Sequence, residues 1–108
     1  MVNNLNDIVS HSMAFIEDDY TELWVIVNKI FEENKEMDFL QLVKATKLIV
    51  TELVEKYNVQ LLDEETQVPL TLKKEEIIRV VEKRLISLNK IPNIGDGIWF
   101  TIKSQSPF

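Results

Sequence analysis

The chain offers few residues whose chemistry could support catalysis. Its 108 residues include one histidine and no cysteine, which excludes a cysteine nucleophile, a thiolate metal site and a site built on two histidines. His11 lies between Ser10 and Ser12, where it has no second histidine to share a metal and no cysteine to activate. We therefore expect His11 to be a surface or hydrogen-bonded residue, and we predict no enzyme activity, no catalytic residue and no metal.

The two glycines of the chain, Gly95 and Gly97, flank Asp96. They precede an apolar, β-prone segment, whereas a phosphate-binding loop leads into the start of a helix. We therefore predict a tight turn in which the glycines take positive backbone angles, and we predict no cofactor.

Four acidic residues gather in the first quarter of the chain: Glu17, Asp18, Asp19 and Glu22. They lack the alternating ligand pattern and the sharp glycine turn of a calcium loop. One interpretation is a solvated corner with acids at the start of a helix. The other is a contact surface for a basic protein partner.

The charge is unevenly distributed along the sequence. The net charge is −6 overall, and residues 1–38 contain nine acids and two lysines, a net charge of −7. Residues 73–108 contain seven bases and four acids, a net charge of +3. The molecule as a whole would repel a phosphate backbone, which disfavours a nucleic acid as the partner.

The spacing of apolar residues predicts four helices over about 5–17, 20–31, 39–57 and 72–88. Asp38 and Thr71 are suitable residues to cap the third and fourth helices, and Asn58 and Asn89 are suitable to end them. The second helix is apolar on two edges, so we expect it to be central and to place Trp24 in the core.

Two segments indicate a small β element. Residues 59–70 resemble two extended arms around a polar turn, although Pro69 would confine its arm to an edge. Residues 98–102 form an apolar, β-prone run after the glycine turn, and alternation should send Trp99 to the face opposite Ile98 and Phe100. A partly exposed Trp99 would be a suitable anchor for a protein partner.

These elements predict a mainly α fold with about four helices around the second one, in a single domain that covers residues 1–108. Apolar residues make up 45% of the chain and charged residues 28%, as in ordinary globular domains. No segment approaches the ~20 apolar residues that cross a bilayer, and the start lacks a basic leader. We therefore expect a cytoplasmic protein that does not enter a membrane.

Two short patches carry a resemblance to a known class of protein. Leu23 and Trp24, together with the segment 96–100 (Asp, Gly, Ile, Trp, Phe), resemble a group of small acidic bacterial proteins. Some of these are similar to immunity proteins, which neutralise toxins delivered between competing bacteria. The resemblance implies a protein that binds a toxin domain, in many cases a nuclease, and blocks it without chemistry of its own. The acidic first third would then compete with phosphate for the basic groove of such a nuclease. The resemblance carries over no binding residues, so the candidates for the partner contact remain those indicated by the sequence itself: Glu17, Asp18, Asp19, Glu22 and Trp99.

The alternative function is DNA binding by a winged-helix-like regulator. Its basis is a set of bases on the expected fourth helix: Lys73, Lys74, Lys83, Arg84 and Lys90. However, no basic and polar recognition helix stands out, because the third helix carries Glu52 and Glu55 beside its lysines.

Overall fold

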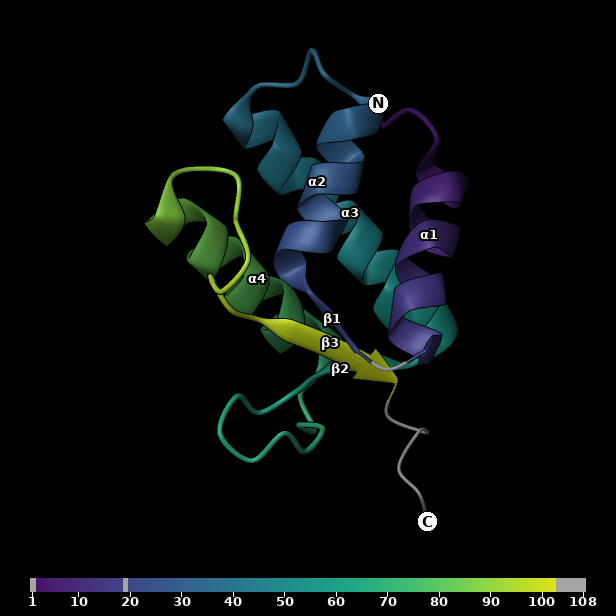
Figure 1. The fold of residues 1–108 in the computed structure, drawn as a ribbon, viewed down its shortest axis with the longest axis vertical. Coiled ribbons are helices and arrows are strands. Elements are labelled where there is room, and N and C mark those ends of the chain that lie inside the picture. Colours follow the sequence, from purple (N-terminus) through teal and green to yellow (C-terminus); the bar gives the residue numbers. More distant parts are fainter. Residues whose placement is uncertain (1, 19, 103–108) are drawn as a thin grey trace.

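Helices dominate the computed structural model of the chain, which describes residues 2–18 and 20–102 (Figure 1). Over these residues the predicted mainly α fold with a small β element is confirmed. The elements are α1 (Leu5–Asp18), β1 (Thr21–Glu22), α2 (Leu23–Glu33), α3 (Phe39–Tyr57), β2 (Val59–Leu61), α4 (Lys74–Leu88) and β3 (Trp99–Ile102).

Local signals set most of the helix ends. The Asp38 carboxylate accepts a hydrogen bond of 2.8 Å from the amide of Gln41, whose side chain accepts one of 2.9 Å from the amide of Asp38. This capping box satisfies two amide groups that have no partner within the helix. Asn58 and Asn89 end α3 and α4 in the left-handed conformation, with φ of 56° and 52°, as their residue type predicts.

Two expected helix starts are wrong by two or three residues. Helix α2 begins at Leu23, because Thr21 and Glu22 pair with β3 as a short strand. Helix α4 begins at Lys74, and its cap is Lys73 and not Thr71. The Glu76 side chain accepts a hydrogen bond of 3.0 Å from the amide of Lys73 and so fixes this start.

The three strands form one antiparallel sheet in the order β1-β3-β2. In its register Glu22 lies opposite Trp99, and Leu61 lies opposite Phe100. The first arm of the expected 59–70 hairpin is thus β2, but its ladder partner is β3. The second arm lies beside the first as predicted: Leu62 and Pro69 form a bridge, the amide of Asp63 donates to the carbonyl of Val68 at 3.0 Å, and the amide of Leu70 donates to the carbonyl of Leu61 at 2.8 Å. Pro69 has no amide, and neither of these hydrogen bonds requires one.

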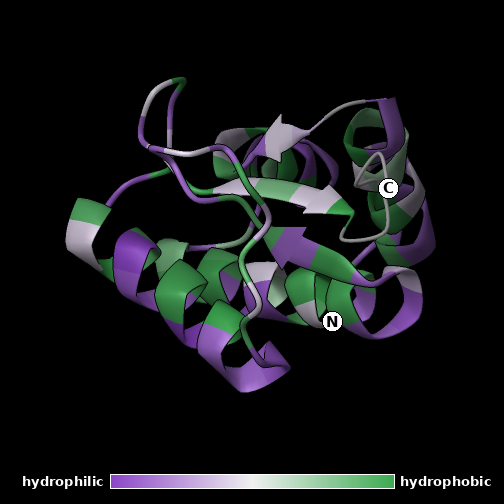
Figure 2. Cartoon of the chain, turned by 90° about the horizontal axis from the view of Figure 1, so that it is seen from below, coloured by the Kyte–Doolittle hydropathy of each residue, from purple (hydrophilic) through white to green (hydrophobic). Residues whose placement is uncertain are grey.

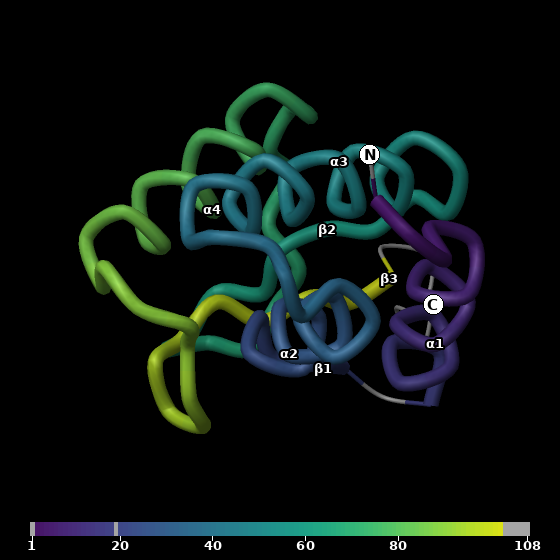
Figure 3. The backbone as a smooth tube through the Cα atoms, turned by 90° about the horizontal axis from the view of Figure 1, so that it is seen from above, coloured from purple at the N-terminus to yellow at the C-terminus, as the bar shows by residue number. Residues whose placement is uncertain are grey.

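The helices lie on one face of the sheet and the 62–72 loop lies beyond the other (Figures 1 and 3). Helix α2 contacts α1 and α3, and α3 also contacts α4 and β2, so these two helices share the centre of the fold. Phe100 is completely buried in the core between sheet and helices. Trp24, which we expected in the core, is only partly buried. The buried residues of α2 are Leu23, Ile26, Val27 and Ile30.

Candidate functional site

A small pocket opens on the side of the sheet that the helices leave uncovered. Figure 2 shows the cartoon of the fold from this side. It has a volume of about 110 Å³. We name it the aromatic pocket, and its lining residues are Tyr20, Leu62, Asp63, Glu64, Gln67 and Trp99. They come from the segment before β1, from the start of β3 and from the loop after β2.

The pairing of β1 with β3 positions the two aromatic side chains of this pocket. Successive side chains of a strand point to opposite faces, so the burial of Phe100 in the core directs its neighbour Trp99 to the other face. Trp99 is partly buried there, as its position in the strand predicts. Tyr20 packs against it edge to face, with ring centroids 5.2 Å apart and ring planes at 80°, a favourable geometry for two aromatic rings.

The polar turn after β2 holds one carboxylate of the pocket in place. Asp63 accepts hydrogen bonds of 2.9 Å from the amides of Glu65 and Thr66, both through Oδ1. These backbone amides stabilise the ionised form and hold the pKa of Asp63 below its ordinary value, with Thr66 the larger cause. Asp63 is therefore a fixed negative charge at neutral pH.

Glu64 connects the same turn to the start of β3. Its Oε1 accepts a hydrogen bond of 2.9 Å from the amide of Ile98. Ile98 has a φ of 63°, a left-handed angle that is rare for a β-branched residue. The contact with Glu64 helps to hold this residue next to Trp99, so the geometry of the pocket depends on a contact across 34 positions of sequence.

Glu22 does not belong to an exposed acidic surface, in contrast to the sequence-based expectation. Its side chain is 2% exposed. Its carboxylate accepts hydrogen bonds from the amide of Gly95, at 3.0 and 3.2 Å, and from the amide of Gly97, at 2.8 Å. The glycines have φ of 92° and 94°, as predicted for this turn. Glu22 is buried because the turn of residues 93–97 encloses its carboxylate with backbone donors.

Glu17 and Asp18 are exposed in the last turn of α1, as an acidic contact surface requires. We name this pair the α1 acids; Asp19 lies outside the described residues. The pair occupies the negative end of the helix dipole, with no basic residue in that turn, where each acid costs about 0.3–1 kcal/mol.

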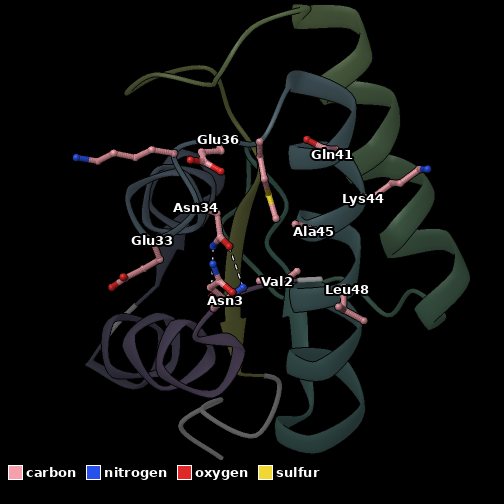
Figure 4. Close-up of a pocket in the computed structure, with 11 residues that line it drawn as sticks. Val2, Asn3, Glu33, Asn34, Glu36, Gln41, Lys44, Ala45 and Leu48 are labelled. Carbon is pink, nitrogen blue, oxygen red and sulfur yellow. Dashed lines mark hydrogen bonds between the residues drawn. The ribbon is translucent and has the colours of Figure 1, made fainter.

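A second, larger depression of about 970 Å³ lies between the N-terminal segment, the α2–α3 connection and α3 (Figure 4). Its Asn34 side chain is saturated by bonds to Asn3 and to the carbonyl of Ile30. The side chains of Glu33 and Lys44 extend away from its centre. This depression therefore lacks a group of polar side chains that converge on a ligand, and it contains no residue that the sequence singled out.

Most of the bases attributed to the fourth helix are engaged within the fold. Lys74 pairs with Glu55 at 2.8 Å, and Lys90 pairs with Asp96 at 3.1 Å. Arg84 donates to the backbone carbonyl of Asp96. Lys73, Lys83 and Lys90 are exposed, but Lys90 is paired with Asp96, so α4 does not present the five bases as one continuous basic strip.

Residues 2–18 and 20–102 contain neither a metal-binding cluster nor a helix that could span a membrane. Within these ranges no three histidine, cysteine or acidic side chains are placed to hold a metal ion. In the same part of the chain, no helix has the length and apolar character that a membrane span needs.

The ring of His11 packs edge to face on the ring of Phe15, with ring centroids 5.1 Å apart.

No protein-family model, no curated protein and no solved structure matches the chain.

The sequence indicated the α1 acids and Trp99 as candidate site residues, but it did not indicate Tyr20, Asp63 or Glu64. The turn-forming run of residues 63–66 was the only available signal for the two carboxylates. It predicts a loop but not the proximity of that loop to Trp99.

Proposed function

We propose that the chain is a protein-binding module that acts in the cytoplasm without chemistry of its own. Its partner is a basic protein, and the specific role we propose is that of an immunity protein that blocks a bacterial toxin domain. The binding surface consists of the aromatic pocket and the α1 acids.

One observation carries the proposal, namely that two partly exposed aromatic rings and two carboxylates line the same pocket. Tryptophan and tyrosine are enriched among the residues that dominate binding energy at protein interfaces. Tyr20 is 39% exposed and follows the α1 acids by two positions. An aromatic centre with an acidic rim matches the usual anatomy of an interface and selects a partner with basic residues.

Charge supports a fast encounter with such a partner. Residues 1–38 carry a net charge of −7, and complementary charge raises association rates. A toxin that acts on nucleic acid needs a basic substrate groove, and an acidic protein that covers this groove competes with phosphate. The proposed immunity role requires only such coverage and no catalytic group.

The first experiment identifies the partner at this surface. A photo-crosslinking amino acid replaces Val68, whose side chain is 57% exposed in the loop beside the aromatic pocket, and in a control it replaces Leu40, which is 67% exposed at the start of α3. We expect a specific crosslink to a basic protein from Val68 and not from Leu40. Crosslinks of equal yield from both positions would contradict the assigned surface.

The second experiment measures association with the purified partner. Glu17→Gln/Asp18→Asn should slow association most at low salt, and the difference should shrink near physiological ionic strength, where the screening length is about 8 Å. Glu32→Gln/Glu36→Gln removes the same charge from the end of α2 and the connection after it, and should have a smaller effect. Equal rates for the two variants across the salt series would refute the α1 acids as part of the surface.

The immunity role has its own readout. An equimolar amount of the chain should inhibit the activity of the crosslinked partner, because the complex covers its active or substrate-binding surface. If the partner keeps full activity in the complex, the chain would still be a protein-binding module, but the immunity role would be contradicted.

A further inference from the structure

The aromatic pocket has the size of a site for a single side chain. Its volume of about 110 Å³ is well below the roughly 300–1,000 Å³ of pockets that hold drug-sized ligands. Its walls come from three separate segments of the chain, so the pocket is formed by the tertiary fold and not by one flexible loop.

Each of the two carboxylates of the pocket is fixed through one oxygen. Asp63 uses Oδ1 for the amides of its own turn, and Glu64 uses Oε1 for the amide of Ile98. The side chain of Thr66 also interacts with the Asp63 carboxylate, whereas the second oxygen of Glu64 makes no hydrogen bond to any described residue. Both side chains are therefore held in place, and Glu64 retains an acceptor for an incoming donor.

No lysine or arginine among the described residues lines the pocket. Arg84 approaches Glu64 next to the glycine turn, where a Cβ added at Gly97 would meet both Arg84 Nη1 and Glu64 Oε1. The guanidinium of Arg84 donates instead to the carbonyl of Asp96. Asp63 forms no ion pair with a lysine or arginine of the described residues.

The combination of aromatic faces and carboxylates selects for a cation. A lysine ammonium or an arginine guanidinium is attracted to the face of an aromatic ring, most strongly to tryptophan, by about 0.5–2 kcal/mol. Carboxylate oxygens add charge-assisted hydrogen bonds, which are stronger than those between neutral groups. A neutral apolar side chain of equal length would gain neither contribution.

We propose that the aromatic pocket receives one lysine or arginine side chain of the partner protein. This inference rests on the proposed function, because it assigns the contact that the binding surface makes. It adds the chemical class of the residue recognised and the four side chains that recognise it: Tyr20, Asp63, Glu64 and Trp99.

Three blocked tripeptides test the pocket without the partner: glycine-lysine-glycine, glycine-arginine-glycine and glycine-norleucine-glycine. Their binding is followed by NMR at the indole N–H of Trp99, identified with Trp99→Phe, and at the amides of Glu64 and Gln67. We expect saturable shifts with the two cationic peptides and an affinity at least about tenfold weaker for norleucine. Equal affinity for norleucine, or no shift at these three groups, would overturn the proposal.

Two variants in the same turn separate the pocket from the general acidic field. Asp63→Asn keeps an oxygen that can accept from the amides of Glu65 and Thr66 but removes the charge, and should weaken the cationic peptides severalfold. Glu65→Gln removes an exposed charge that does not line the pocket, and should leave their affinity within about twofold. Equal losses in both variants would mean that the peptides sense a diffuse field, and the pocket assignment would be wrong.

Failure of this inference is distinguishable from failure of the proposed function. If the peptides do not bind but Glu17→Gln/Asp18→Asn still slows association with the basic partner, the binding surface stands without the cation pocket. If the peptides bind but the partner crosslinks equally from Leu40 and Val68, the pocket is a cation site and the proposed surface is wrong.

Discussion

The carboxylate of Glu22 accepts a hydrogen bond of 2.8 Å from the backbone amide of Gly97, 75 positions later in the chain. The amide of Gly95 donates to the same carboxylate. This contact connects the start of α2 to the turn before β3, and so it sets where Trp99 enters the sheet. A residue expected on the surface is thus part of the support of the aromatic pocket.

Glu22→Ala should lower the free energy of unfolding by about 2–4 kcal/mol, because it leaves two partly buried amides without an acceptor. Glu22→Gln keeps one oxygen that can accept and should cost less. Urea denaturation measures both, with exposed Glu36→Gln as a control that we expect to lie within about 0.5 kcal/mol of the wild type. A loss below about 1 kcal/mol for Glu22→Ala would show that the turn does not depend on this carboxylate.

Gly97→Ala should destabilise the protein more than Gly95→Ala. Both glycines have positive φ, so each substitution carries strain on the order of 1–3 kcal/mol. A Cβ at Gly95 meets no atom within 4 Å, whereas one at Gly97 meets Arg84 and Glu64 at 2.3 and 2.8 Å. Moving these side-chain ends aside would disturb the hydrogen bonds of Arg84 to the carbonyl of Asp96 and of Glu64 to the amide of Ile98, so we expect an extra cost of about 0.5–1.5 kcal/mol for Gly97→Ala in thermal or urea unfolding. Equal losses of unfolding free energy in the two glycine variants would mean that the side chains of Arg84 and Glu64 move aside without a measurable cost.

The turn after β2 should lose order in acid. Asp63 has a lowered pKa in the folded protein because it accepts amide hydrogen bonds. Its contribution to stability is therefore fully present above the unfolded value of about 3.9 and is lost as the pH falls through the folded value. An NMR titration should show the amides of Glu65 and Thr66 shifting together with a midpoint below about 3.9. Asp63→Asn should abolish this transition, and a midpoint above 3.9 would contradict the assignment.

Phe100→Ala should mainly reduce stability and Trp99→Ala should mainly reduce partner binding, although the two residues are neighbours. Phe100 is completely buried, so its truncation should cost about 3–5 kcal/mol in unfolding free energy. Trp99 is partly exposed in the aromatic pocket, so its truncation should cost less stability and reduce partner binding more than tenfold, as at interface residues that dominate affinity. Measurements of unfolding free energy and partner affinity on both variants test this difference. Normal binding by a folded Trp99→Ala variant would show that Trp99 is not part of the binding surface.

The amino-acid sequence determined those features that depend on residues a few positions apart. The Asp38 cap, the left-handed ends at Asn58 and Asn89 and the apolar spacing of Ile77, Val81 and Leu85 are all local, and each was predictable. The same holds for the positive angles at the glycine turn and for the exposure of Trp99 opposite Phe100, because strand alternation acts between adjacent residues.

Only the tertiary structure decided where Glu22 and Asp63 lie. An acidic residue at the end of a charged run usually faces water, and Glu22 is buried only because a turn 73 to 75 positions away supplies its donors. Asp63 lies beside Trp99 because β2, which ends two residues before Asp63, pairs with β3. Such contacts form when packing brings distant segments together, and the burial that drives packing is not directional. The local pattern therefore cannot specify which distant backbone amide will face a given carboxylate.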